Sequence, residues 1–260
     1  MSNFMPGDKY KEYLLTTCQE VGATLLKKGL AFAADKQAQI GYDAKATKEV
    51  VVANARYLHR GFFCPSPVQD LIVNNARRGK IIARPTERSR ISHRYLFDTS
   101  GQLLIAKALL PNGTYKTEYL VYEHNSVYGF AFDAWGTLVG LSEEQYENGK
   151  LKNYFCASCF NHEGDNIDLG ITNMHYEAYH YDEIGLHDVE FYFITPPVMM
   201  HNGCENIDEL MQGSRYRFVR EHGYLIGLYA VKLNGVEFNR DNNIRKIAVP
   251  RKLPEWKQSE

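Results

Sequence analysis

The middle of the chain is divided into short segments by turn signals that recur about every dozen residues. The segments between them are rich in β-branched and aromatic side chains, which favour strands. Short polar turns between such strands are typical of antiparallel hairpins. The pattern therefore predicts a meander of hairpins from Tyr95 onward. Later strands are expected at 174–194, 216–220, 224–233 and 236–238. The turns of the meander are DTSG at 98–101, PNG at 111–113, HNS at 124–126, DAWG at 133–136 and ENG at 147–149.

One motif, aromatic-Asp-x-x-Gly-x-Leu, occurs twice at an offset of 35 residues. An Asp side chain accepts hydrogen bonds from its own turn, and Gly supplies the positive φ that closes it. We therefore expect Asp98–Gly101 and Asp133–Gly136 to form two similar β-turns. An internal duplication explains the repeat, and so does convergence of tyrosine-rich hairpins on one turn chemistry. The offset also aligns Phe97 with Phe132, Leu103 with Leu138 and Tyr119 with Tyr154, and a looser copy occupies 179–186.

These two copies, each followed by an Asn-Gly pair, resemble YD repeats, the β-hairpin repeats of Rhs-type bacterial toxin shells. The resemblance covers 95–154, and the chain departs from it in having two good copies and Phe before Asp where Tyr is usual. It implies a curled antiparallel sheet and a bacterial conflict-system context, and it brings no catalytic residues.

The first third of the chain has the periodicity of helices. Apolar residues within 10–28 recur at spacings of four, three and four, which places them on one helix face. A second helix is expected at 44–59, a third at 66–79 with Ser66 as its cap, and a short one at 207–211. The residues of the first apolar face are Leu14, Cys18, Val21 and Leu25.

The predicted fold class is α+β, with N-terminal helices packed on a twisted antiparallel β-hairpin meander. We assign 1–79 to a helical region and 80–260 to a mainly antiparallel β region. Because no linker-like stretch separates the two regions, we expect one compact domain.

The net charge of −1 conceals an uneven distribution. Residues 1–94 carry 16 Lys+Arg and 8 Asp+Glu. Residues 95–190 carry only 4 Lys+Arg against 15 Asp+Glu, and residues 191–260 carry 10 Lys+Arg and 8 Asp+Glu. Either the basic and acidic thirds neutralise each other inside one fold, or an acidic face remains for a basic partner.

The cysteines and the N-terminus bear on the compartment. Five scattered cysteines do not form a disulfide framework, which favours reduced thiols in a cytosol. No apolar run approaches the roughly 18 residues of a membrane span, and the first residues lack the apolar core of a signal peptide. We expect a cytoplasmic protein that does not engage a membrane.

A Cys-x2-Cys pair followed by two histidines has spacing compatible with a zinc site. The candidate ligands are Cys156, Cys159, His175 and His180. Against this site, 174–183 is expected to be a strand, and positions 175 and 180 then point to opposite faces. The alternative is two partly buried thiols and two exposed histidines, and no cofactor is expected.

Imidazoles and carboxylates also alternate between His175 and Glu190, a composition that holds metals or performs acid–base catalysis. The same alternation is typical of the solvent face of an acidic hairpin. These residues are His175, Glu177, His180, Asp182, Glu183, His187, Asp188 and Glu190.

The basic run at 77–94 carries seven Lys+Arg against Glu87 alone. Such runs bind phosphates, but this one contains no Phe, Tyr or Trp for base stacking. The acidic middle of the chain is its expected internal partner. The chain has no G-x-S-x-G, P-loop, G-x-G-x-x-G or H-E-x-x-H motif.

Three functions remain open. The first is a non-enzymatic protein-binding module, such as an immunity protein whose acidic, tyrosine-rich face neutralises a basic toxin. The second is a metal-dependent hydrolase or nuclease that uses 156–190, and the third is a nucleic-acid binder that uses 77–94. The expected contact residues of the first are Tyr119, Tyr122, Glu123, Glu143, Glu144, Tyr146 and Glu147.

Overall fold

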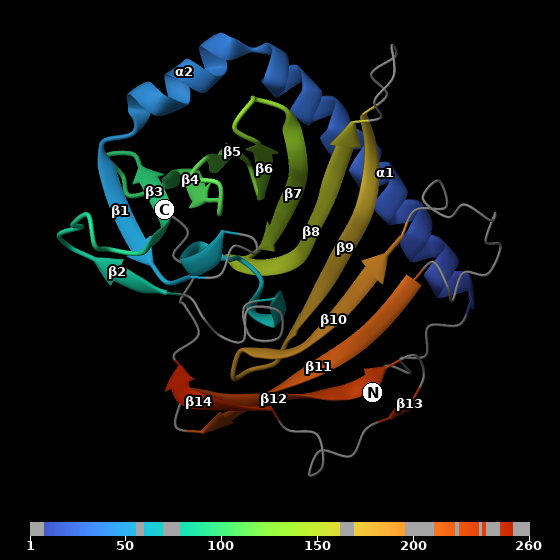
Figure 1. Ribbon diagram of the computed structural model, residues 1–260. Coiled ribbons are helices and arrows are strands. Elements are labelled where there is room, and N and C mark those ends of the chain that lie inside the picture. Colours follow the sequence, from blue (N-terminus) through green and yellow to red (C-terminus); the bar gives the residue numbers. More distant parts are fainter. Residues whose placement is uncertain are drawn as a thin grey trace. The chain divides into compact units, whose positions relative to one another are not determined.

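The computed structural model describes residues 8–55, 60–69, 79–161, 169–195, 211–221, 224–233, 236–237 and 245–251. The chain divides into two units. Unit 1 consists of residues 1–24 and 145–256, and unit 2 consists of residues 25–144 and 257–260. Helix α1 (Asp8–Ala34) and strand β7 (Leu138–Glu147) contribute to both units (Figure 1).

The strands of unit 2 form an antiparallel sheet in which most neighbours are consecutive in the chain. Their order is β7-β6-β5-β4-β3-β1-β2. The one departure from a simple meander is β1, which lies between β2 and β3. The bounds are β1 (Lys48–Ala53), β2 (Lys80–Ile82), β3 (Ile91–Phe97), β4 (Leu103–Leu109), β5 (Tyr115–Glu123) and β6 (Ser126–Phe132).

The strands of unit 1 follow the same up-and-down order, β7-β8-β9-β10-β11-β12-β13, and β14 also pairs with β12. Each neighbouring pair from β8 to β13 is antiparallel, and so is the pair of β12 and β14. The bounds are β8 (Lys150–Asn161), β9 (Leu169–Tyr181), β10 (Leu186–Ile194), β11 (Met211–Glu221), β12 (Tyr224–Leu233), β13 (Val236–Glu237) and β14 (Arg245–Arg251).

The predicted α+β class, with N-terminal helices packed on an antiparallel meander, is confirmed. The apolar face of α1 is buried at Leu14, Cys18 and Leu25, as its spacing predicts. Farther along α1, Phe32 packs on β6 through Phe130, with ring centroids 5.4 Å apart. Helix α2 (Lys36–Lys45) adds Tyr42 to the same cluster of unit 2.

The predicted helix at 44–59 is wrong over most of its described length. Helix α2 ends at Lys45, and 48–53 form β1. Three consecutive valines, Val50–Val52, occupy the centre of this strand, and β-branched side chains favour a pleated surface. Their pairing with β3, in which Val50 lies opposite Tyr95, decides the outcome. The helical region 1–79 therefore contains a strand, and 56–59 lie outside the described residues.

The other two predicted helices are only partly described. The helix at 66–79 begins as expected, because the Ser66 hydroxyl accepts a hydrogen bond from the Gln69 N–H at 2.9 Å. Its continuation at 70–78 lies outside the described residues. The same holds for 207–210, while Met211 begins strand β11.

The two Asp-x-x-Gly turns of unit 2 have the same geometry, as predicted. Asp98 accepts hydrogen bonds from the N–H groups of Ser100 and Gln102, both at 2.9 Å. Asp133 accepts from Trp135 and Thr137 at 2.9 and 2.8 Å. The closing glycines have φ of +87° at 101 and +81° at 136. The looser third copy differs, because the Asp182 N–H donates to the carbonyl three residues on, at Gly185, whereas the Asp98 and Asp133 N–H groups donate to the carbonyl four residues on.

A short segment of unit 2, residues 60–69, covers the sheet face opposite the helices; we call it the strap. Side chains alternate along β5, so Tyr119 faces the helices and Glu118 faces the strap. Tyr95 lies on the strap face, where its hydroxyl donates to the Arg60 carbonyl at 2.5 Å and accepts from the Phe62 N–H at 2.9 Å. The ring of Phe63 packs on Tyr95 at 4.7 Å between centroids.

Candidate functional site

Three carboxylates are buried on strands β9 and β10 of unit 1, which makes this region the main candidate site. Glu177 and Asp188 are fully buried, and Glu190 is 1% exposed. A buried carboxylate is costly unless hydrogen bonds or cations compensate for its lost hydration. Each of the three has such partners, and together with these partners they form a polar network.

The strand register assigns the three carboxylates to two faces. Along β9, His175, Glu177 and Tyr179 alternate with residues of the other face. His180 lies directly opposite Asp188 in the β9–β10 ladder, so the two share that other face. Glu190 lies two residues beyond Asp188 and shares it too.

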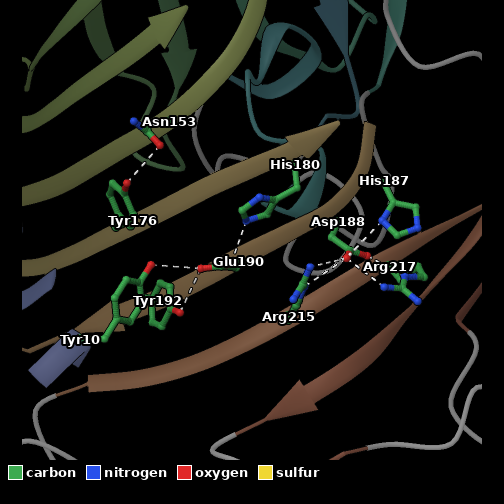
Figure 2. A network of polar contacts seen from close by, with 10 residues as sticks. All are labelled: Tyr10, Asn153, Tyr176, His180, His187, Asp188, Glu190, Tyr192, Arg215 and Arg217. Carbon is green, nitrogen blue, oxygen red and sulfur yellow. Dashed lines mark hydrogen bonds and ion pairs between the residues drawn. The ribbon is translucent and has the colours of Figure 1, made fainter. Parts of the chain in front are cut away.

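Glu190 is the centre of the network on the face that holds Tyr10 of α1 (Figure 2). His180 Nε2 lies 2.7 Å from its Oε1, and the hydroxyls of Tyr192 and Tyr10 donate to its Oε2 at 3.2 and 3.4 Å. Burial and the Glu190 charge raise the pKa of Tyr10 to about 12, so this hydroxyl stays protonated and donates. Tyr176, nearby on β9, donates instead to Asn153 at 3.0 Å.

Asp188 is held by two arginines of β11. Arg215 donates from Nη2 and Arg217 from Nε, at 2.7 and 2.8 Å (Figure 2). His187 Nδ1 lies 3.2 Å from the same carboxylate. Burial alone would raise the pKa of Asp188, but these cationic partners outweigh it and hold the pKa below its ordinary value.

Glu177 is compensated on the opposite face of the sheet. His175 Nε2 lies 2.8 Å from its Oε1, and the Tyr179 hydroxyl donates to its Oε2. The expectation that these alternating acids form a solvent face is therefore wrong for Glu177, Asp188 and Glu190. The same expectation agrees with the structure at Asp182 and Glu183, which are exposed.

The four candidate zinc ligands do not converge. Cys156 and His175 are opposite each other across β8 and β9, but Cys159 lies opposite Ile171. His175 and His180 are directed to opposite faces and to different carboxylates. Among the described residues, no group of three or more His, Cys, Asp and Glu side chains is placed to hold a metal.

The expected contact residues are divided between the two units. Unit 1 contains Tyr146 and Glu147. Unit 2 contains the other five, which are Tyr119, Tyr122, Glu123, Glu143 and Glu144. Tyr119 packs on Phe32 and Tyr42. Tyr122 and Glu123 are exposed, although Glu123 pairs with Lys28 at 2.7 Å. Glu143 and Tyr146 are half-buried, and Glu147 is exposed beside Lys152.

Glu144 is the clear error in that set, because its side chain is only 5% exposed. It pairs with Arg60 of the strap, which also donates to Glu118 Oε1 and Ser142 Oγ, both at 3.0 Å. Gly129 leaves the space for this group, since a Cβ at this position would collide with Glu118 and Ser142. Glu144 is thus an interior partner of unit 2.

The basic run at 77–94 was expected to pair with the acidic middle of the chain, but its residue Arg94 has a different partner. Arg94 pairs with Glu49 at 2.9 Å, a carboxylate of the basic third itself. Residues 77 and 78 lie outside the described residues. Arginines from other parts of the chain, Arg60, Arg215 and Arg217, pair with the acidic middle.

The division into units changes the meaning of the charge asymmetry. Unit 2 contains 17 Lys+Arg and 12 Asp+Glu, whereas unit 1 contains 13 and 19. The unit that contains β8–β10 is therefore the acidic one. The net negative charge of unit 1 favours the approach of a basic partner to this unit.

One end of the unit 1 strands brings exposed acids and a large apolar side chain together. Lys150 lies over the Tyr181 ring at 5.2 Å, and the Tyr181 hydroxyl donates to the Leu151 carbonyl at 2.9 Å, so the β7–β8 and β9–β10 turns share this end. Ile184 is 83% exposed. We call this the hairpin-end surface, and it consists of Glu147, Tyr181, Asp182, Glu183 and Ile184.

Several members of the network were not predicted from the sequence. Arg215, Arg217 and Tyr10 lie far along the chain from β9 and β10, and no local pattern links them to these strands. The signal that was present is the Glu-x-Tyr spelling of Glu177–Tyr179 and Glu190–Tyr192, which puts an acid and a hydroxyl two residues apart on one strand face.

No family model matches the chain, and no curated protein matches it significantly. In the part of the chain that the structure describes, neither helix is long and apolar enough to cross a membrane.

Proposed function

We propose that this chain is a non-enzymatic protein-binding module that presents the hairpin-end surface of unit 1 to a basic protein partner. The observation that carries the proposal is Ile184, an apolar side chain 83% exposed at a turn and flanked by Glu183. Apolar anchors surrounded by polar groups are typical of binding hot spots. Acidic neighbours speed the association with a cationic surface.

The geometry of the turn supports this role. Asp182 Oδ1 accepts hydrogen bonds from the N–H groups of Ile184 and Gly185, both at 2.9 Å. Arg220 donates to the Ile184 carbonyl at 3.2 Å. A loop fixed in this way loses less entropy when a partner binds. An immunity protein that neutralises a basic toxin is the function that best fits such a surface.

The test is affinity capture from a lysate of the source cells with the wild-type chain and two double variants. Glu183→Lys with Ile184→Ser alters the hairpin-end surface. Glu12→Lys with Tyr13→Ser is the matched control, an exposed acid beside an exposed ring on α1 of the same unit. We expect one basic protein, identified by mass spectrometry, to bind wild type and control, to elute at high ionic strength, and to be lost with the hairpin variant. Capture of the same protein by the hairpin variant would contradict the proposal.

A hydrolytic function is the second candidate, and one observation favours it. The His180 side chain is 45% exposed, and its Nε2 contacts the buried Glu190 carboxylate. An imidazole oriented by a carboxylate is the arrangement of a general base. Hydrolysis of bis(4-nitrophenyl) phosphate with and without Mn²⁺ tests it. Activity that His180→Gln abolishes and His124→Gln leaves intact would favour this candidate over the binding module.

A further inference from the structure

The strap of unit 2 lies directly over a buried histidine. His93 of β3 is fully buried, and neither ring nitrogen has a hydrogen-bond partner within the described structure. Its ring stacks on Tyr95 with 3° between the planes and 5.7 Å between the centroids. Gly61 of the strap packs against the imidazole so closely that a Cβ at this position would approach His93 Cε1 to 2.8 Å.

Several contacts hold the strap over this imidazole. Arg60 anchors it to Glu118, Ser142 and Glu144. Two residues after Arg60, the Phe62 N–H donates a hydrogen bond to the Tyr95 hydroxyl. Farther along the strap, Cys64 is fully buried. Gly61 of the strap therefore covers the imidazole, and the Arg60 ion cluster, the Tyr95 hydroxyl and the packing of Phe63 on Tyr95 are among the contacts that attach the strap to the sheet.

A neutral imidazole tolerates this position better than an imidazolium, because a buried charge without an acceptor is strongly disfavoured. Burial, and Lys116 on β5, lower the pKa of His93 to about 4. The charged and titratable groups on this face of the sheet and on the strap include Tyr95 on β3, Lys116 and Glu118 on β5, Arg60 and Cys64 on the strap, and Glu144 on β7. Both carboxylates already pair with Arg60.

We propose that His93 is an acid-sensitive latch, whose protonation releases the strap 60–69 from the sheet of unit 2. Release lets water reach the imidazolium and exposes a polar sheet face that includes Glu118, Ser142 and Glu144. The proposal concerns unit 2 and is independent of the binding surface proposed for unit 1.

The sign of the pH effect follows from the direction of the shift. The closed state favours the neutral ring, so the open state binds the extra proton once the pH falls below the ordinary histidine pKa of about 6.5. Between pH 6.5 and 4.5, with a closed-state pKa of about 4, the open population should rise roughly fortyfold. Above pH 7 the latch should be insensitive to pH.

Cys64 allows a direct test. We would label the full-length protein with 4,4′-dithiodipyridine, which reacts at acid pH, and locate the label by mass spectrometry. Cys18, fully buried in α1 of unit 1, reports global unfolding in the same sample. We expect the labelling rate of Cys64 to rise roughly fortyfold from pH 6.5 to 4.5 while Cys18 stays slow. In His93→Phe, which keeps the ring and removes the titration, the rise should disappear.

His124→Asn is the matched control, because it removes an exposed turn histidine of the same unit. This variant should keep the wild-type rise. The proposal is overturned if His93→Phe keeps the full rise, because Glu118 and Glu144 then cause it. It is also overturned if Cys64 and Cys18 become reactive together, because acid then unfolds the whole protein.

Discussion

Arg60 and Glu144, which lie 84 positions apart in the sequence, form an ion pair in the interior of unit 2. The pair joins the strap to β7, and its arginine also contacts Glu118 and Ser142. Removing one partner of such a pair leaves an uncompensated buried charge.

Replacing Glu144 by Gln should therefore destabilise the protein by about 3 kcal/mol. Glu147→Gln is the control on the same strand, since its contact with Lys152 is exposed and should contribute under about 0.5 kcal/mol. Urea unfolding measured by circular dichroism gives both values. Equal midpoints for the two variants would mean that the buried pair contributes no more than a surface pair.

Gly129→Ala should destabilise unit 2 by about 1–3 kcal/mol, because the added methyl group collides with Glu118 and Ser142. Gly41→Ala in α2 is the control. A Cβ there meets open space, and alanine favours a helix over glycine by about 0.5–1 kcal/mol. The two variants should shift the unfolding temperature in opposite directions. A neutral Gly129→Ala would show that the ion cluster relaxes around the methyl group.

Asp98→Ala and Asp133→Ala should each cost about 1 kcal/mol, since each carboxylate accepts two backbone hydrogen bonds of its turn. Thr99→Ala changes an exposed side chain in the first turn and should be neutral. Chemical denaturation checks all three, and the double aspartate variant should show the sum of the two costs. If the two substitutions lower the free energy of unfolding by clearly different amounts, the two turns have the same geometry but contribute differently to stability.

Asp188→Asn should destabilise the protein near neutral pH and have little effect in acid. Burial opposes ionisation, but Arg217, Arg215 and His187 hold the pKa of Asp188 below its ordinary value. A depressed carboxyl pKa contributes stability above the unfolded-state value of about 3.9, and this contribution is lost as the pH falls through the folded-state pKa. Urea midpoints at pH 7 and pH 3 test this, with exposed Asp43→Asn as the control. A cost that stays constant with pH would point to packing and not to charge.

Purified protein should contain no stoichiometric zinc, because Cys156, Cys159, His175 and His180 do not converge. Elemental analysis after extensive dialysis measures the metal, and Cys156→Ser should leave the content unchanged. One equivalent of zinc that falls in this variant would restore the metal-dependent hydrolase as the leading function.

The sequence predicted those features of the fold that local chemistry determines. Asp98, Gly101, Asp133 and Gly136 form their turns from their own side chains and φ angles, so their geometry was predictable. The resemblance to YD repeats stays a prediction. The strand β1 was missed because the spacing of its apolar residues also fits a helix, and only the pairing with β3 distinguishes the two.

The burial of the acidic residues could not be predicted for a different reason. Alternation along β9 and β10 shows which residues share a face, but it does not show what covers that face. Tyr10 reaches Glu190 from a helix 180 positions earlier, and Arg217 reaches Asp188 from another strand. Glu144 was misplaced in the same way, since its partner Arg60 lies in the strap.

The order of the segments along the chain has a consequence for biosynthesis. Unit 1 is built from residues 1–24 and from residues 145 onward, so the ribosome must make all of 25–144 before unit 1 can close. At about 5–20 residues per second this delay lasts roughly 6 to 24 seconds. Through that interval Leu14 and Cys18, at the start of α1, have no β8 or β9 to bury them. The nascent chain is then a natural client for chaperones that hold exposed apolar helices.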